Sequence, residues 1–404
     1  MAYATMYAFR KPFNAATYGE YTLWGFQLKS VLLTSQIIGY MLSKFIGIKV
    51  ISELTNTSRK RLILYLIMFA HAALLLFAIV PVPFKFVCLF LNGLPLGLVW
   101  GVLFSFVEGR KLTEALAAGI AIGAILSSGL VKSLARYLMD NSYLNVPEFW
   151  MPFTVGVLFL PLLLLSIWML QQIPEPDPQD IAQKTIRTTL NSKQRNRMFT
   201  LFFPGILAFV LLYVCLTVFR DFRDNYAVEI MEEAGEFQSG IFAKTELFVA
   251  FIVLLTTSLV IFIKNNSRAF FLCQWLILLG FLTMVFAGIA LKFDYISFLH
   301  FTIISGIGMA MGYVPFQIVL LERFVATFKI RGNVGFLMYL SDSFGYLVSV
   351  LLIFSGEFGW WNFIKSQLIV DLAFYGGIAG SVFSLLSLLY FFVQRKTAKN
   401  VSII

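Results

Sequence analysis

The sequence predicts an all-α membrane protein with two sets of six transmembrane helices, the first helix being truncated. Three observations support this prediction: 59% of the 404 residues are hydrophobic, only 13% are charged, and long apolar runs alternate with short polar loops. A soluble domain carries about a quarter charged residues, so this chain has too little charge to cover a water-soluble globule of its size. The composition therefore excludes a soluble enzyme, a disordered chain and a disulfide scaffold.

Eleven segments are long and apolar enough to cross a bilayer, which requires about 20 residues. They are expected near residues 25–49, 62–83, 86–107, 113–135, 150–171, 199–220, 239–263, 268–291, 296–320, 332–355 and 368–393. Residues 1–9 are apolar but too short to span, and basic residues follow them, whereas a signal peptide carries its basic residues first. We interpret residues 1–9 as half of a twelfth helix, which would be the first in the chain.

Most of the 31 basic residues fall in one set of alternating loops and in the C-terminal tail. Positive charge marks the cytoplasmic side of a membrane protein, so both termini are expected in the cytoplasm of a cell-membrane protein. Because the net charge of +10 is an orientation signal here, the expected partner is a lipid bilayer and not nucleic acid.

One connection is longer and more polar than the others. Residues 172–198 contain the sequence PEPDP and then turn basic, which is typical of a linker. The predicted organisation is an N-terminal bundle over 1–171, this cytoplasmic linker, a C-terminal six-helix bundle over 199–394 and a tail over 395–404.

The two halves of the chain resemble each other. AFRKPFNAA at 8–16 matches VFRDFRDNYA at 218–227, and NGLPLGLVWGVLFSFVEGR at 92–110 matches SGIGMAMGYVPFQIVLLER at 305–323. The two pairs have nearly the same offset, which favours an internal repeat. A parallel repeat of six plus six helices is the plan of the major facilitator transporters.

Three cations within or beside apolar segments are candidate anion ligands. Arg10 and Arg220 occupy matching places in the two halves, and two guanidinium groups that converge on one cavity would clamp a carboxylate or phosphate. Lys44 lies five residues before the expected end of its helix. The alternative is that the arginines are helix-exit charges and that Lys44 reaches the membrane interface.

Tyrosines accompany these cations at helical spacing. Tyr3 and Tyr7 are one turn apart, Tyr7 precedes Arg10 by three residues, and Tyr40 precedes Lys44 by four. Their hydroxyls could orient a polar substrate, or the rings could serve only for packing or as an interfacial belt.

Asp342 is the clearest acid inside an apolar segment. An isolated carboxylate there suits proton coupling, although a hydrogen bond to a hydroxyl such as that of Ser341 is the commoner explanation. His71 and His300 are more often satisfied core residues, and no metal or cofactor motif is present. The acidic segment 221–236 is either a solvated face or a gate at the outer mouth.

Several motifs resemble the organophosphate:phosphate antiporter family of the major facilitator superfamily. They are YATMYAFRKPF at 3–13, GYMLSKFIGIKVISELTNTSRK at 39–60 and LNGLPLGLVWGVLFSF in the Gly-rich segment. The resemblance implies that Arg10 and Arg220 bind a substrate phosphate, that Lys44 lies nearby, and that Tyr3, Tyr7 and Tyr40 line the site.

The chain departs from that family in three places. It has Ser127 and Ser128 where the family has a fifth-helix histidine, Glu53 in place of an aspartate in a longer loop, and the added charges of RDFRDN after the first residues of the seventh-helix motif. These departures leave the identity of the anion open.

The predicted function is secondary active transport of a small organic anion, phosphorylated by resemblance, through alternating access. Inorganic phosphate or protons are the candidate coupled species. The alternative is a transporter-like receptor that binds such an anion and signals through a partner. A membrane enzyme ranks third because the sequence offers no convincing catalytic set.

Overall fold

The computed structural model describes residues 1–52, 56–107, 113–173, 192–236, 241–328, 330, 334–357 and 364–398. In the first helix set these form α1 (Ala2–Met6), η1 (Tyr7–Phe9), η2 (Pro12–Ala15), α2 (Leu28–Ser52), α3 (Asn56–Ile79), η3 (Val82–Phe84), α4 (Lys85–Val107), α5 (Thr113–Asp140) and α6 (Met151–Gln171). In the second helix set they form α8 (Ser192–Leu201), α9 (Phe203–Asn225), α10 (Ala227–Glu233), α11 (Ile241–Ile261), α12 (Asn266–Lys292), α13 (Phe298–Pro315), η4 (Phe316–Leu320), α14 (Leu321–Thr327), α15 (Val334–Glu357), α16 (Lys365–Asp371), η5 (Leu372–Gly376) and α17 (Gly377–Ala398).

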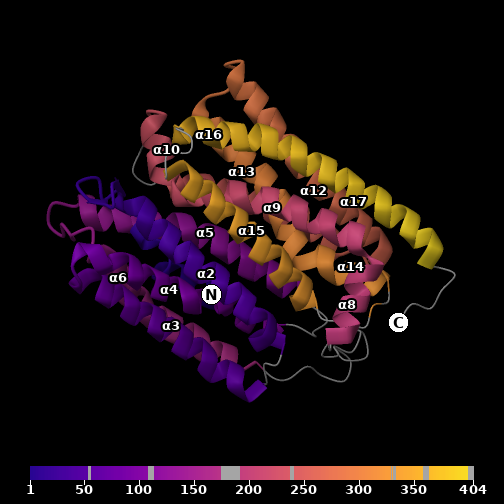
Figure 1. The fold of residues 1–404 in the computed structure, drawn as a ribbon, viewed down its shortest axis with the longest axis horizontal. Helices are drawn as coiled ribbons and strands as arrows, with labels where there is room; N and C mark the ends of the chain where they lie inside the picture. The colour runs from indigo at the N-terminus through magenta and orange to yellow at the C-terminus, as the bar shows by residue number, and fades with distance from the viewer. Residues whose placement is uncertain are drawn as a thin grey trace.

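The long helices run roughly parallel or antiparallel in two groups that lie side by side (Figure 1). Helices α2 to α6, drawn in indigo and purple, form one group, and α9 to α17, drawn in pink to yellow, form the other. Helices α10 and α16 lie at one end of the molecule, and α8 lies at the opposite end (Figure 1). The arrangement confirms the predicted all-α class.

Nine helices among the described residues are long and apolar enough to cross a membrane. Two long helices are not among the nine: α2, which carries three lysines, and α11, whose apolar stretch Thr245–Val260 is shorter. The predicted spans coincide with the long helices to within a few residues, with two exceptions. The span 296–320 continues through the π turn η4 into α14, and the span 368–393 covers α16, the π turn η5 and α17. Most of the predicted linker lies outside the described residues, so the domain boundaries remain a prediction.

A short hairpin precedes α2. Strands β1 (Thr22–Leu23) and β2 (Phe26–Gln27) pair antiparallel around a two-residue turn in which Trp24 and Gly25 both have positive φ. Such a turn matches the natural twist of paired strands, and glycine adopts it without strain. The hairpin leads directly into α2, which carries the candidate site residues Tyr40 and Lys44.

Helices α2 and α4 pack closely because two glycines leave room for the neighbouring backbone. A Cβ added to Gly93 would lie 2.2 Å from the carbonyl oxygen of Gln36, and one added to Gly97 would lie 2.7 Å from that of Tyr40. Small residues allow such close helix contact. This contact fixes the position of Tyr40 relative to α4.

Ion pairs join the two helix sets at the end that carries α10. Each takes its cation from the first set and its acid from the second. They connect Lys11 and Lys132 to Asp224, Lys29 to Glu229, and Arg136 to Glu232. The acidic segment 221–236 is thus not simply a solvated face, because several of its carboxylates hold the two sets together.

Candidate functional site

A cavity lies between the two helix sets. The first set contributes Tyr3, Tyr7, Arg10, Lys11, Tyr40, Lys44, Trp100, Ala121, Ala124 and Ser128. The second set contributes Arg220, Asp221, Arg223, Asp224, Glu246, Met309, Ala310, Tyr313, Val314, Gln317, Asp342 and Tyr346. All seven residues singled out from the sequence therefore line one cavity, while their roles in binding remain predictions.

The N-terminal segment brings Arg10 into this cavity. Helix α1 ends at Met6 and continues as the 3-10 turn η1, which ends with Arg10 as its C-cap residue. The backbone oxygen of Arg10 accepts a hydrogen bond from Gln36 Nε2 (3.1 Å), which ties the turn to α2. The Arg10 guanidinium carbon lies 3.8 Å from the centroid of the Tyr40 ring, as in a cation–π contact.

Arg10 has no carboxylate partner among the residues that the structure describes, although its exposed fraction is only 6%. Its Nε atom is fully buried and without a hydrogen-bond partner. A buried cation is costly unless it is paired, so this guanidinium is electrostatically incomplete. Ring contact with Tyr40 offsets only part of that cost.

Arg220 is engaged by protein groups. Its Nε and Nη2 atoms donate to Oδ1 of Asp221 at 3.1 and 2.7 Å, and Nη2 also donates to the hydroxyl of Tyr346 at 2.8 Å. Its guanidinium carbon lies 4.3 Å from the Tyr313 ring centroid. The structure therefore places both predicted arginines in the cavity, but only Arg10 is unpaired.

Asp342 is not isolated, contrary to the expectation from sequence. Its Oδ2 lies 2.7 Å from Nζ of Lys44, and its Oδ1 accepts from the Tyr213 hydroxyl and from Gln317 Nε2 (3.0 Å). Lys44 and Asp342 are both almost fully buried. The two charges come from apolar segments almost 300 positions apart, and each supplies the partner that the other needs in a low-dielectric setting.

The other cations of the cavity are also paired with acids. Lys11 contacts Asp224, and Arg223 Nη1 lies 2.7 Å from Glu246 Oε1. Five basic and four acidic side chains line the cavity, which gives it a formal excess of one positive charge. That excess corresponds to the unpaired Arg10.

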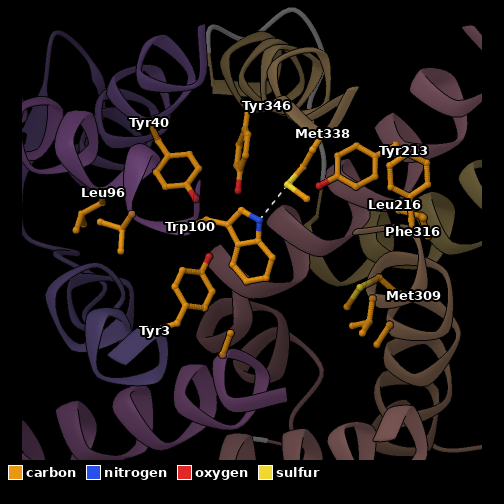
Figure 2. Close-up of a cluster of buried hydrophobic side chains, with 14 of the residues drawn as sticks. Tyr3, Tyr40, Leu96, Trp100, Tyr213, Leu216, Met309, Phe316, Met338 and Tyr346 are labelled. Carbon is orange, nitrogen blue, oxygen red and sulfur yellow. Dashed lines mark hydrogen bonds between the residues drawn. The ribbon is translucent and has the colours of Figure 1, made fainter. Parts of the chain in front are cut away.

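Aromatic side chains surround the position of Arg10. Figure 2 shows the hydroxyls of Tyr3, Tyr40 and Tyr346 directed toward the space beside the Trp100 ring. The hydroxyls of Tyr3, Tyr7 and Tyr40 have no hydrogen-bond partner within the described part of the chain. The indole N–H of Trp100 is already used, because it donates to Met338 Sδ at 3.1 Å across the two sets (Figure 2).

The two histidines lie elsewhere. His71 stacks on Phe153 with 4.7 Å between ring centroids, and the exposed His300 contacts the hydroxyl of Ser297 through Nδ1 at 2.8 Å. No group of three or more His, Cys, Asp or Glu side chains in the described ranges is placed to hold a metal ion.

Sequence reasoning did not identify several of the lining residues. Asp221 and Asp224 belong to a segment noted only for its acidity, and Trp100 and Tyr313 lie inside the repeated Gly-rich segments. The sequence did indicate Asp221, because it directly follows the candidate residue Arg220. For Trp100 and Tyr313 an aromatic residue in an apolar helix carries no distinguishing mark.

The fold is similar to that of a solved transporter. The crystal structure of a variant of the peptide transporter POT in complex with alafosfalin matches with a TM-score of 0.61 and 13% sequence identity, covering 98% of this chain and 94% of that chain. At this identity the similarity concerns the fold alone. Together with the apolar helices, it confirms the predicted fold class, an all-α membrane fold like that of this peptide transporter.

The chain belongs to a protein family of unknown function, DUF5690, whose model matches residues 12–395. No curated protein matches the sequence. The specific resemblance to organophosphate:phosphate antiporters therefore rests on the sequence motifs alone.

Proposed function

We propose that this protein is a secondary active transporter of a small organic anion with a phosphate group. The observation that carries the proposal is the unpaired guanidinium of Arg10 in a cavity between the two helix sets. In a fold of this type, rocking of one set against the other would expose such a cavity to each side of the membrane in turn.

The chemistry around Arg10 favours an oxyanion. A guanidinium presents parallel N–H donors that match two oxygens of a phosphate or carboxylate. The unpartnered hydroxyls of Tyr3, Tyr7 and Tyr40 line the same cavity and could donate to further oxygens. A tetrahedral phosphate has more acceptor oxygens than a carboxylate and would use this donor set more fully.

Arg220 and Lys44 would play secondary roles in this state. Each already holds a carboxylate, Asp221 and Asp342 respectively, so an incoming anion would compete with a protein acid for them. If the anion draws Lys44 away, Asp342 is left as an uncompensated buried charge, which protonation would relieve. This exchange supports proton coupling through Asp342, with inorganic phosphate as the other candidate coupled species.

The proposal places the protein in a cell membrane with both termini in the cytoplasm, because most of the basic residues fall in one set of alternating loops and in the C-terminal tail. The predicted bundles over 1–171 and 199–394 would be the two moving bodies, joined by the linker 172–198. The end that carries the ion pairs of α10 would then face outward.

Counterflow in proteoliposomes tests the proposal. Vesicles loaded with unlabelled phosphate should accumulate external radiolabelled phosphate when they contain the protein, and empty vesicles should not. A receptor would bind the anion without this flux. Binding of phosphate by the purified protein together with a flux equal to that of empty vesicles would therefore favour the receptor and refute transport.

A further inference from the structure

The helical path of the N-terminal segment is interrupted between η1 and η2, where the chain presents Arg10 to the cavity. Helix η2 starts at Pro12. Proline has no backbone N–H, so it cannot donate to the carbonyl of Phe9, three residues before it. Inside a membrane protein a carbonyl at such an interruption needs a donor from the protein, because water is not there to supply one. Side chains of neighbouring helices supply the donors at this place.

Two buried amides bind the carbonyls at the interruption. Asn92 Nδ2 on α4 donates to the carbonyl oxygen of Phe9 at 3.0 Å, and Gln36 Nε2 on α2 donates to that of Arg10 at 3.1 Å. Gln36 is 2% exposed and Asn92 is fully buried. Neither side chain lines the cavity. The two amides can therefore act on a ligand only through the residues that they hold.

The two amides also bind each other. Gln36 Nε2 donates to Asn92 Oδ1 at 2.8 Å, and Asn92 Nδ2 donates a second hydrogen bond to the carbonyl oxygen of Ala70 on α3 at 2.9 Å. Each amide nitrogen thus uses both of its N–H donors. A flipped Asn92 amide would place its oxygen against two carbonyl oxygens, so the network has a single arrangement. It ties the segment that carries Arg10 to α2, α3 and α4.

Gly93 makes this network possible. It follows Asn92 in the sequence, and a Cβ at this position would lie 2.2 Å from the carbonyl oxygen of Gln36. Because Gly93 has no side chain, α2 and α4 approach closely enough for the two amides to bond. A buried polar network in which every donor is used is rigid, since any displacement leaves polar groups unpaired in a low-dielectric setting.

We infer that Gln36 and Asn92 are positioning residues for anion binding, because they fix the backbone at Phe9 and Arg10 and so hold the Arg10 guanidinium in place. The inference rests on the proposed function, since it assumes that Arg10 binds the anion. A planar fork that meets two oxygens at once tolerates displacement of only about 0.5 Å. Misplacement that breaks one charge-assisted hydrogen bond to the anion weakens binding by about tenfold or more.

Isothermal titration of the purified protein with inorganic phosphate tests this inference. Gln36→Met removes both donors of Gln36 and keeps a side chain of similar length, and Asn92→Leu removes the donors of Asn92. Each variant should bind phosphate about tenfold more weakly. Gln274→Met is the matched control, because Gln274 is a buried amide of α12 that accepts a hydrogen bond from Ser387 and does not line the cavity. The control should leave phosphate affinity unchanged.

Combination with Arg10→Lys separates positioning from a general loss of structure. Gln36→Met should change phosphate affinity by less than about twofold in the Arg10→Lys background, because its effect passes through the guanidinium. Equal losses in both backgrounds would overturn the inference, and so would unchanged affinity in the folded single variants. Gln36→Met keeps the test decisive if Asn92→Leu does not fold, since Asn92 then keeps both bonds that it donates. An absence of phosphate binding by the unsubstituted protein would instead refute the proposed function, and the inference with it.

Discussion

Replacement of Arg10 by lysine should impair anion binding strongly although the charge is kept. The guanidinium of Arg10 can hold two oxygens of one anion at once, whereas an ammonium group is a point charge that cannot reproduce this fork. The substitution therefore separates charge from geometry. It also retains a cation near the Tyr40 ring, which limits effects on folding.

The expected loss follows from the contacts of Arg10. Loss of one charge-assisted hydrogen bond to a buried anion costs about 1.5–3 kcal/mol, which corresponds to about ten- to over a hundredfold in affinity. Arg220→Lys should cost less, because Asp221 already occupies two of the N–H donors of Arg220. The two effects should be non-additive if both side chains hold the same phosphate.

Isothermal titration calorimetry of the purified protein with inorganic phosphate measures these affinities. Arg268→Lys is the control, because Arg268 is exposed at the start of α12 and far along the chain from any lining residue. Near-wild-type affinity of a correctly folded Arg10→Lys variant would show that Arg10 is only a helix-exit charge. That result would refute the anion site built on it.

Three further predictions concern proton coupling, the contact between the two helix sets and membrane topology. Asp342→Asn should lower phosphate accumulation driven by a pH gradient while exchange persists, because an amide cannot take up the coupling proton; an unchanged pH dependence of accumulation would remove Asp342 from coupling. Lys29→Glu and Glu229→Lys should each lower the thermal unfolding midpoint, because each places two like charges in a largely buried pair. The double variant restores opposite charges and should recover part of the lost midpoint. No recovery would show that the pair does not join the two sets. In a cysteine-free background, a cysteine in place of Ser142 should be labelled only from outside, and a cysteine in place of Lys264 only from the cytoplasm. Labelling of both positions from the same side would mean that a span is miscounted.

The helices could be predicted from the sequence because their signal is local. A membrane span requires about 20 consecutive apolar residues, and each run is visible without knowledge of the rest of the chain. The ends were less certain, as for 296–320, where the helix continues through a π turn into α14. Convergence of Arg10 and Arg220 could also be anticipated, because the repeat places them at matching positions of two similar halves.

Pairings across the two sets could not be predicted, because they depend on how the sets dock. Nothing near Asp342 in the sequence indicates that Lys44 will neutralise it. The stacking of Arg10 on Tyr40 was not indicated either, because Tyr40 lies on α2 and not in the segment that carries Arg10.

The central claim is that the anion binds at Arg10 between the two helix sets. Crystals of the protein soaked with 4-bromophenyl phosphate would locate both ends of such a ligand, because bromine scatters anomalously. The account predicts phosphate density within hydrogen-bond distance of the Arg10 guanidinium. Phosphate density at another place, with Arg10 still unpaired at saturating ligand, would contradict it.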